Sequence, residues 1–181
     1  MTIVGLDELG PDTLEQLAQL TLPAAREHAP EWLPDLPAAR EEIADALAPG
    51  KIARVLLDAS GDPVGWVAAF HDWGQVWELH PLIVAIEHQR RGHGRHLVRE
   101  IERIAAAEGA LTMTLSTSDT TGATSLGGVD LYDDTFGRLA RIELRHPHAV
   151  EFWRRIGYHI VGALPDAEGP GKPSIHLARR L

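Results

Sequence analysis

The hydrophobic and polar positions along the chain change period near residue 50. Before that point, leucines recur at helical spacing from residue 11 onward, and we expect prolines to interrupt the helical stretch 11–48. The expected breaks are Pro23, Pro30, Pro34 and Pro37. The last part, residues 38–48, is predicted to be a short helix with Ile43 and Leu47 on one side.

After residue 50, the pattern is typical of strands that alternate with helices. Residues 52–57 and 64–70 are predicted to be strands joined by a turn at Ser60-Gly61-Asp62-Pro63, which makes them a hairpin. The other predicted strands are 75–84, with a break at Pro81, 111–115, 158–162 and 174–178, and the predicted helices are 92–108, 129–144 and 147–156. This order predicts one mixed α/β domain over residues 1–181 with about six strands.

Composition narrows the class of protein. The chain of 181 residues has no cysteine, which excludes disulfides, thiolate metal ligands and a cysteine nucleophile. The longest apolar run is far below the roughly 18 residues that cross a membrane. The first residues resemble no secretory signal, so we expect a cytoplasmic protein.

The net charge of −9 is concentrated at the start of the chain, where residues 1–50 carry ten carboxylates against Arg26 and Arg40. Such an acidic surface disfavours nucleic acid, whose binding depends on neutralising phosphates. It favours a cationic small molecule, although acidic residues kept only for solubility would give the same pattern. The ten histidines show no zinc-protease spacing, so we expect no metal.

The segment with the strongest chemical signal is Gln89-Arg90-Arg91-Gly92-His93-Gly94-Arg95, between a predicted strand and an amphipathic helix. The first N–H groups of a helix have no partner inside the helix, and the helix dipole makes this end electropositive. Glycines at such a turn let an anion approach the backbone, and the arginines add charge. The segment therefore predicts a pyrophosphate site, against the alternative of an ordinary solvated helix start.

This loop resembles the Gln/Arg-x-x-Gly-x-Gly/Ala motif of the GNAT superfamily of acetyltransferases. Further motifs resemble the aminoglycoside 6'-N-acetyltransferases, in particular their small dimeric branch. They are Trp77-Glu78-Leu79-His80-Pro81-Leu82, Asp130-Leu131-Tyr132, His146-Pro147, Gly157-Tyr158-His159-Ile160-Val161-Gly162 and Leu164-Pro165-Asp166-Ala167. The resemblance covers residues 52–181 and is weak over residues 1–50. It implies the GNAT fold with six or seven strands, acetyl-CoA as co-substrate, a cationic amine as acceptor, and a homodimer.

The resemblance also implies roles for single residues. Glu78 and His80 match catalytic positions and, two apart on a strand, are expected on one face; Glu78 is the candidate base and also an amine ligand. The backbone N–H of Leu82 is expected to polarise the thioester carbonyl. Pairing with the pantetheine arm is expected at Ile83 and Val84. A salt bridge for Glu78 and a structural hydrogen bond for His80 are the alternatives.

Two positions depart from the family pattern. Where many relatives have a tyrosine that protonates the leaving thiolate, this chain has Trp153, and indole is no proton-exchanging acid. The loop after the fifth strand of the family fold offers only Asp119 as a substrate ligand. Trp32 and Trp73 could stack on a sugar or belong to the core. The sequence therefore also allows another amine acceptor, or an acyl-CoA-binding module without turnover.

Overall fold

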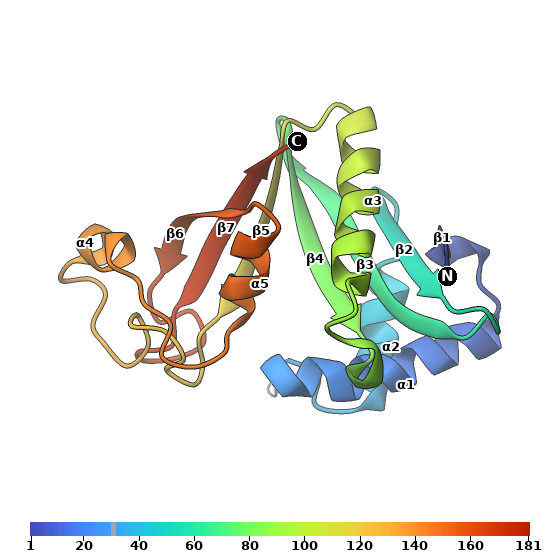
Figure 1. The fold of residues 1–181 in the computed structure, drawn as a ribbon, viewed down its shortest axis with the longest axis horizontal. Coiled ribbons are helices and arrows are strands. Elements are labelled where there is room, and N and C mark those ends of the chain that lie inside the picture. Colours follow the sequence, from blue (N-terminus) through green and yellow to red (C-terminus); the bar gives the residue numbers. More distant parts are fainter. Residues whose placement is uncertain (30–31) are drawn as a thin grey trace. The chain divides into compact units, whose positions relative to one another are not determined.

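The computed structural model describes residues 1–29 and 32–181 and divides into two compact units. The first comprises residues 1–113 with Leu181, and the second comprises residues 114–180. Across the described residues there are seven strands and five α-helices, which confirms the expected α/β fold with six or seven strands (Figure 1). No described helix is long and apolar enough to span a membrane.

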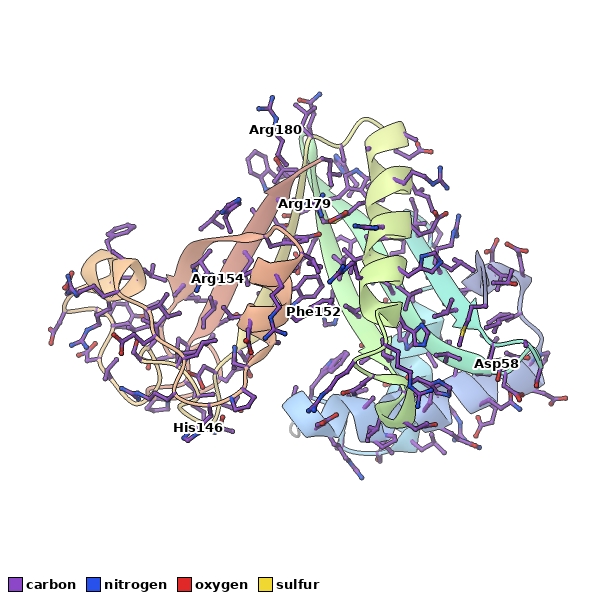
Figure 2. The ribbon with its side chains drawn as sticks, in the orientation of Figure 1. Asp58, His146, Phe152, Arg154, Arg179 and Arg180 are labelled. Atoms are coloured by element: carbon purple, nitrogen blue, oxygen red, sulfur yellow. The ribbon has the colours of Figure 1, made fainter. Side chains whose placement is uncertain are left out.

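The first unit is built on four antiparallel strands in the order β1-β2-β3-β4. They are β1 Thr2–Gly5, β2 Lys51–Leu57, β3 Pro63–Trp73 and β4 Val76–Val84. The β2–β3 hairpin turn is held by Asp58, labelled in Figure 2, whose carboxylate accepts from the N–H groups of Ser60 (2.7 Å) and Asp62 (3.0 Å). The short edge strand β1 was not expected, because its four residues carry little periodic signal.

Helix α1, Pro11–His28, corrects the expected break at Pro23, because the helix continues through that residue. A proline removes one helical hydrogen bond, but the turns on both sides of Pro23 are fixed by packing. Thr21 Oγ1 donates to the Leu17 carbonyl (2.7 Å) and accepts from the indole N–H of the fully buried Trp66 (2.8 Å). This tie between α1 and β3 anchors the core. Pro30, another expected break, lies outside the described residues.

Helix α2, Leu36–Asp45, starts at an N-cap in which Asp35 accepts from the Ala38 N–H (2.9 Å). Ile43 is buried as expected. Leu47 lies beyond the end of the helix and is 43% exposed, so the expectation that it shares the buried side with Ile43 is wrong. Asp35 thereby sets where α2 begins, and with it the position of the carboxylates on that helix.

Both faces of the first sheet are covered (Figure 1). The core cluster formed with α1 and α2 includes Val55, Trp66 and Ala68. Their neighbours Leu56 and Val67, equally buried, point to the opposite face because side chains alternate along a strand. Helix α3, His93–Ala107, contacts β2, β3 and β4 and buries Leu97, Val98, Ile101 and Ala105, as its periodicity predicted.

The second unit contains strands β6 His159–Leu164 and β7 Ser174–Arg180 and all but the first two residues of β5 Thr112–Ser118, in the order β5-β7-β6. Helix α5, Ala149–Arg155, is capped at its end by Arg179 of β7, which donates to the Ile156 carbonyl (2.9 Å); residues of both elements are labelled in Figure 2. Beta-strand β6 pairs antiparallel with β7.

The helix expected over residues 129–144 is wrong for most of its length, since α4 covers only Thr135–Ala140. The acidic residues turn the chain locally instead of opening a long helix. Asp130 accepts from the Tyr132 N–H (2.9 Å), and Asp134 caps α4 by accepting from the Gly137 N–H (3.0 Å). Beyond the helix, the Arg145 N–H donates to the Ala123 carbonyl (2.8 Å), which ties this segment to the preceding loop.

Candidate active site

Strand β4 carries a bulge at its centre. Val67 pairs with Leu82 and Ala69 pairs with Leu79, so the single residue Ala68 faces both His80 and Pro81. Pro81 has no N–H for the ladder, which explains why the regular pairing is interrupted there, and the His80–Pro81 peptide is cis. Because a bulge adds one residue to one strand, it changes which face the following side chains point to.

On one side of the bulge, Glu78 and His80 share the sheet face that α1 and α2 cover. Glu78 pairs with Phe70, and the Lys51 ammonium lies over the Phe70 ring (5.4 Å) while it also bonds to Asp45 of α2. The imidazole of His80 contacts Glu42, a residue of α2. The expected shared face of Glu78 and His80 is confirmed, and their roles in chemistry stay predictions.

The imidazole of His80 lies between two groups from the N-terminal part of the chain. Its Nε2 is 3.5 Å from Oε1 of Glu42, and its ring centroid is 5.0 Å from that of Trp32 at an interplanar angle of 59°. The His80 side chain remains 48% exposed, whereas the Glu42 side chain is 18% exposed. An exposed imidazole edge beside carboxylates suits the recognition of an amine.

Burial shifts the pKa values of His80 and Glu42 in opposite directions. Burial lowers the pKa of His80, although the nearby Glu78 carboxylate acts to raise it. Burial also raises the pKa of Glu42, and the charge of Asp45 adds to this effect. His80 is therefore biased toward the neutral imidazole, which can accept a proton.

Beyond the bulge, the groups of β4 that can contact a cofactor are backbone N–H and C=O groups, not side chains. The Ala85 N–H donates to the Val64 carbonyl (2.9 Å), which makes 64 and 85 a hydrogen-bonded pair. Antiparallel pairs alternate between bonded and non-bonded types. In that alternation, Ile83 bonds toward β3, and Leu82 and Val84 direct their N–H and C=O groups away from β3.

This alternation separates the three expected cofactor positions on β4. Leu82 and Val84 direct backbone groups away from β3, where a pantetheine amide or a thioester carbonyl can pair with them; the Val84 carbonyl already accepts from the Gln89 amide. Ile83 is 5% exposed and packs in the core cluster with α1 and α2. Its backbone N–H and C=O groups point toward β3 and pair with that strand. Ile83 is therefore a core residue, and its expected pairing with the cofactor stays a prediction.

The glycine-containing turn has the backbone geometry of an anion site. Gly92 is the N-cap of α3 at φ 88°, a left-handed conformation that glycine adopts without strain, and the His96 N–H donates to its carbonyl (3.1 Å). The N–H groups of His93, Gly94 and Arg95 thus belong to the first turn, where no intrahelical acceptor exists.

The side chains of three arginines add positive charge around this turn. Arg90, Arg91 and Arg95 are exposed and form no ion pair within the described part of the chain. Burial, together with the charges of His88 and Arg91, lowers the pKa of His93, so this imidazole favours its neutral form.

The side-chain amide of Gln89 is already hydrogen-bonded within the protein. It donates to the Val84 carbonyl (3.3 Å) and to Glu27 of α1 (3.0 Å). It therefore connects the edge of β4 to α1. This arrangement gives Gln89 a positioning role beside the turn that the sequence predicted to bind pyrophosphate.

Asp119, expected to bind substrate, organises its own loop. The carboxylate is 1% exposed and accepts from the N–H groups of Ala123 and Thr124 (both 2.8 Å) and from the Thr124 hydroxyl (2.7 Å). Burial would raise the pKa of Asp119, but these hydrogen bonds outweigh it and hold the pKa below its usual value. The hydrogen bonds of Asp119 are thus made within its own loop, and its expected role as a substrate ligand stays a prediction.

The aromatic residues of α5 pack with Tyr158, which directly precedes β6. Trp153 is 7% exposed and meets Phe152 and Tyr158 edge to face, with ring centroids 5.0 and 5.2 Å apart. Tyr158 is 2% exposed, as expected of a core residue. Trp73, a candidate for sugar stacking, is 67% exposed at the end of β3, away from the His80 cluster of Trp32 and Glu42.

Sequence reasoning missed Glu42. The available signal was weak: an acidic N-terminal region that could supply charge to a cationic substrate, with nothing to single out one carboxylate among ten. Only the fold brings residue 42 to residue 80.

Comparisons with known proteins identify the family of the chain. A family model described as "Acetyltransferase (GNAT) family" matches residues 12–137. Comparison of the sequence with curated proteins gives no match.

Solved structures resemble the chain over nearly its whole length. An aminoglycoside 6'-N-acetyltransferase complexed with coenzyme A is 35% identical, covers 99% of this chain and 97% of its own, and has a TM-score of 0.89. The aminoglycoside 6'-N-acetyltransferase from Enterococcus faecium gives 35% identity, the same coverage and a TM-score of 0.87. An aminoglycoside 6'-acetyltransferase type Ii gives 31%, again with 99% and 97% coverage, and 0.72. The chain therefore belongs to the acetyltransferase (GNAT) family.

Proposed function

We propose that this protein transfers an acetyl group from acetyl-CoA to the 6'-amine of an aminoglycoside, by direct attack in a ternary complex. The observation that carries the proposal is the division of β4 by its bulge. Glu78 and His80 lie on one side of it, and the outward backbone groups of Leu82 and Val84 lie on the other, followed by the anion-binding turn. Three structural relatives named for this activity support the same substrate class.

The residues act in a defined order in this proposal. Glu78, with His80 beside it, binds the ammonium group and accepts its proton, because only the neutral amine can attack a carbonyl. The Leu82 N–H donates to the carbonyl oxygen as charge develops there. The first turn of α3, with Gly92 and Gly94, binds the pyrophosphate. Trp153 cannot protonate the thiolate, whose pKa of about 8.5 lets it leave unassisted.

A second candidate acceptor is another amine, such as a polyamine, an amino sugar or a peptide N-terminus. The burial of Asp119 favours it, since the second unit then lacks the carboxylate expected to hold a polycationic sugar. The buried Trp153 in place of a proton donor favours a third candidate, an acyl-CoA-binding module without turnover.

A thiol-release assay with acetyl-CoA separates these candidates. The panel contains an aminoglycoside with a 6'-amine, a matched one with a 6'-hydroxyl, a polyamine, an amino sugar and a peptide. We expect release only with the 6'-amine. Equal release with both aminoglycosides, or release with the polyamine alone, would contradict the assigned acceptor. Binding of acetyl-CoA without thiol release from any substrate would support the third candidate, a module that binds acyl-CoA without turnover.

We also propose that residues 1–181 form one domain, that the protein is a cytoplasmic homodimer, and that it confers antibiotic resistance. A candidate contact surface lies on α4, the segment before it and β6, where large apolar side chains are more than half exposed: Tyr132, Phe136, Val161 and Leu164. Sedimentation of Phe136→Glu against the unaltered protein tests the dimer, and drug sensitivity of expressing cells tests resistance. A monomeric unaltered protein would contradict the dimer.

A further inference from the structure

Glu42 stands out among the carboxylates of residues 1–50 by where α2 places it. Its Oε1 lies 3.5 Å from Nε2 of His80, and its side chain is 18% exposed. The adjacent Glu41 is exposed on the same helix. The contact is longer than an ordinary N–H···O hydrogen bond, so it acts mainly through charge and orientation.

The groups around His80 define the electrostatics of this contact. Glu78 lies on the same strand, and Asp45 and Lys51 approach from the end of α2 and the start of β2. Lys51 bonds to Asp45, so these two charges largely compensate each other. Glu42 lies in contact with the imidazole, and Glu78 has the largest charge effect on the pKa of His80. Trp32 packs against the ring and restricts its rotation.

The position of Glu42 also predicts where the imidazole proton sits. A carboxylate oxygen accepts and cannot donate, so a neutral ring turns its N–H toward it. The nitrogen near Glu42 is Nε2. Nδ1 then keeps its lone pair, because a neutral imidazole carries one proton and the partner of one nitrogen fixes the state of the other.

We propose that Glu42 is a positioning residue, which holds His80 with its proton on Nε2 so that Nδ1 can accept the amine proton from Glu78. The chemical part of this inference rests on the proposed acetyl transfer. An N–H bond of the ammonium breaks as its proton bonds to the Glu78 carboxylate, which leaves the amine lone pair free to attack. The O–H bond of Glu78 then breaks as the Nδ1–H bond of His80 forms. The carboxylate of Glu42 stabilises the resulting imidazolium, and the proton passes afterwards to solvent.

The first test needs no activity. Nitrogen-edited NMR of the unaltered protein reads the protonation of each His80 ring nitrogen, and a carbon-detected titration follows the pKa of His80. We expect the proton on Nε2. In Glu42→Gln, which removes a negative charge, the pKa of His80 should move down, because the imidazolium loses a stabilising neighbour. Glu41→Gln is the matched control and should leave the His80 titration unchanged.

The second test is kinetic and follows the amine identified in the thiol-release assay. We expect Glu42→Gln to lower kcat by about 10- to 10²-fold, the usual loss when a reacting group is displaced by about 1 Å. KM for the amine should stay within about threefold, since Glu42 acts through His80 (uniform binding would change KM instead). Glu42→Asp, which restores the charge, should recover part of kcat.

The outcomes separate this inference from the proposed function. A proton on Nδ1 in the unaltered protein, or a His80 pKa that does not respond to Glu42→Gln, overturns the positioning role even if acetyl transfer is intact. A rise in KM with unchanged kcat would make Glu42 an amine ligand and also overturns it. If no amine is acetylated, the NMR result still decides the Glu42–His80 contact, and only the proposed function fails.

Discussion

The two units use buried carboxylates in different ways. In the second unit, both oxygens of Asp119 accept hydrogen bonds from its own loop, and the side chain is 1% exposed. In the first unit, the partly buried Glu42 has a raised pKa, and the partner that the described residues give it is a half-exposed imidazole at 3.5 Å. A satisfied carboxylate stabilises the fold, whereas an incompletely compensated one beside an exposed edge can still interact with a ligand.

Residue type alone does not distinguish Asp119 from Glu42. Both positions looked like candidate contributors of negative charge to a cationic substrate. Hydrogen-bond satisfaction distinguishes them, and that property depends on neighbours in space. Hydrogen-bond satisfaction also distinguishes the residues of β4. The backbone groups of Ile83 pair with β3, whereas those of Leu82 and Val84 point away from it.

The largest expected effect belongs to Glu78. Glu78→Gln keeps the shape and removes the charge and basicity, so kcat/KM should fall by about 10²–10⁴, the usual worth of a positioned base. Steady-state kinetics with separate titration of acetyl-CoA binding measures it, and acetyl-CoA affinity should hold. A mutant that loses only amine affinity, with kcat intact at saturation, would move the proton-accepting role to His80.

A negative charge at the first turn of α3 should nearly abolish cofactor binding. Gly94→Glu places a carboxylate where the pyrophosphate is expected, at a position that, unlike Gly92, has no left-handed backbone. Acetyl-CoA should raise the melting temperature of the unaltered protein and fail to do so in the mutant, because a ligand stabilises only the state it binds. Ala106→Glu, with the same added charge at the exposed far end of the helix, should keep the full shift.

Asp119→Asn sharpens the contrast between the units. At neutral pH we expect a loss of about 2–4 kcal/mol in unfolding free energy, since two or more charge-assisted hydrogen bonds weaken. The folded-state pKa of Asp119 is lowered, so its contribution is present above the ordinary pKa of aspartate and disappears as the pH falls through the folded value. Thermal unfolding against pH should therefore show the mutant and the unaltered protein converging in acid.

Activity provides the matching readout for this variant. If Asp119 only stabilises its loop, kcat/KM per folded molecule should stay within about threefold. A large rise in KM for the amine at full folding would restore the substrate-binding role that the buried geometry argues against.

The smallest expected effect concerns Tyr158. This residue is 2% exposed and packs edge to face on Trp153, so we expect it to be core and not the acid that replaces the missing proton donor. Tyr158→Phe should leave kcat within a few-fold, checked at saturating substrates on folded protein. A drop of about 10² or more, the usual worth of a general acid, would assign the thiolate's proton to Tyr158.

The sequence by itself determined what depends on neighbours along the chain. Helix α3, the hairpin turn at Asp58 and the glycine turn at Gly92 follow from local periodicity and backbone conformation. For the same reason, the spacing of Glu78 and His80 placed both on one face of a strand. The family resemblance rests on these same short motifs, which is why the fold and family were predictable before any coordinates.

Only the tertiary structure decided which polar groups remain available. Packing around Thr21 and Trp66 carries α1 through Pro23, and the register with Val67 and Ala69 sets the bulge that reverses the faces of β4. The contact between Glu42 and His80 joins segments 38 residues apart, so no local pattern encodes it. Burial and hydrogen-bond satisfaction depend on residues that are far apart in the sequence. These two properties distinguish Asp119, which is bound by its own loop, from Glu42 beside His80.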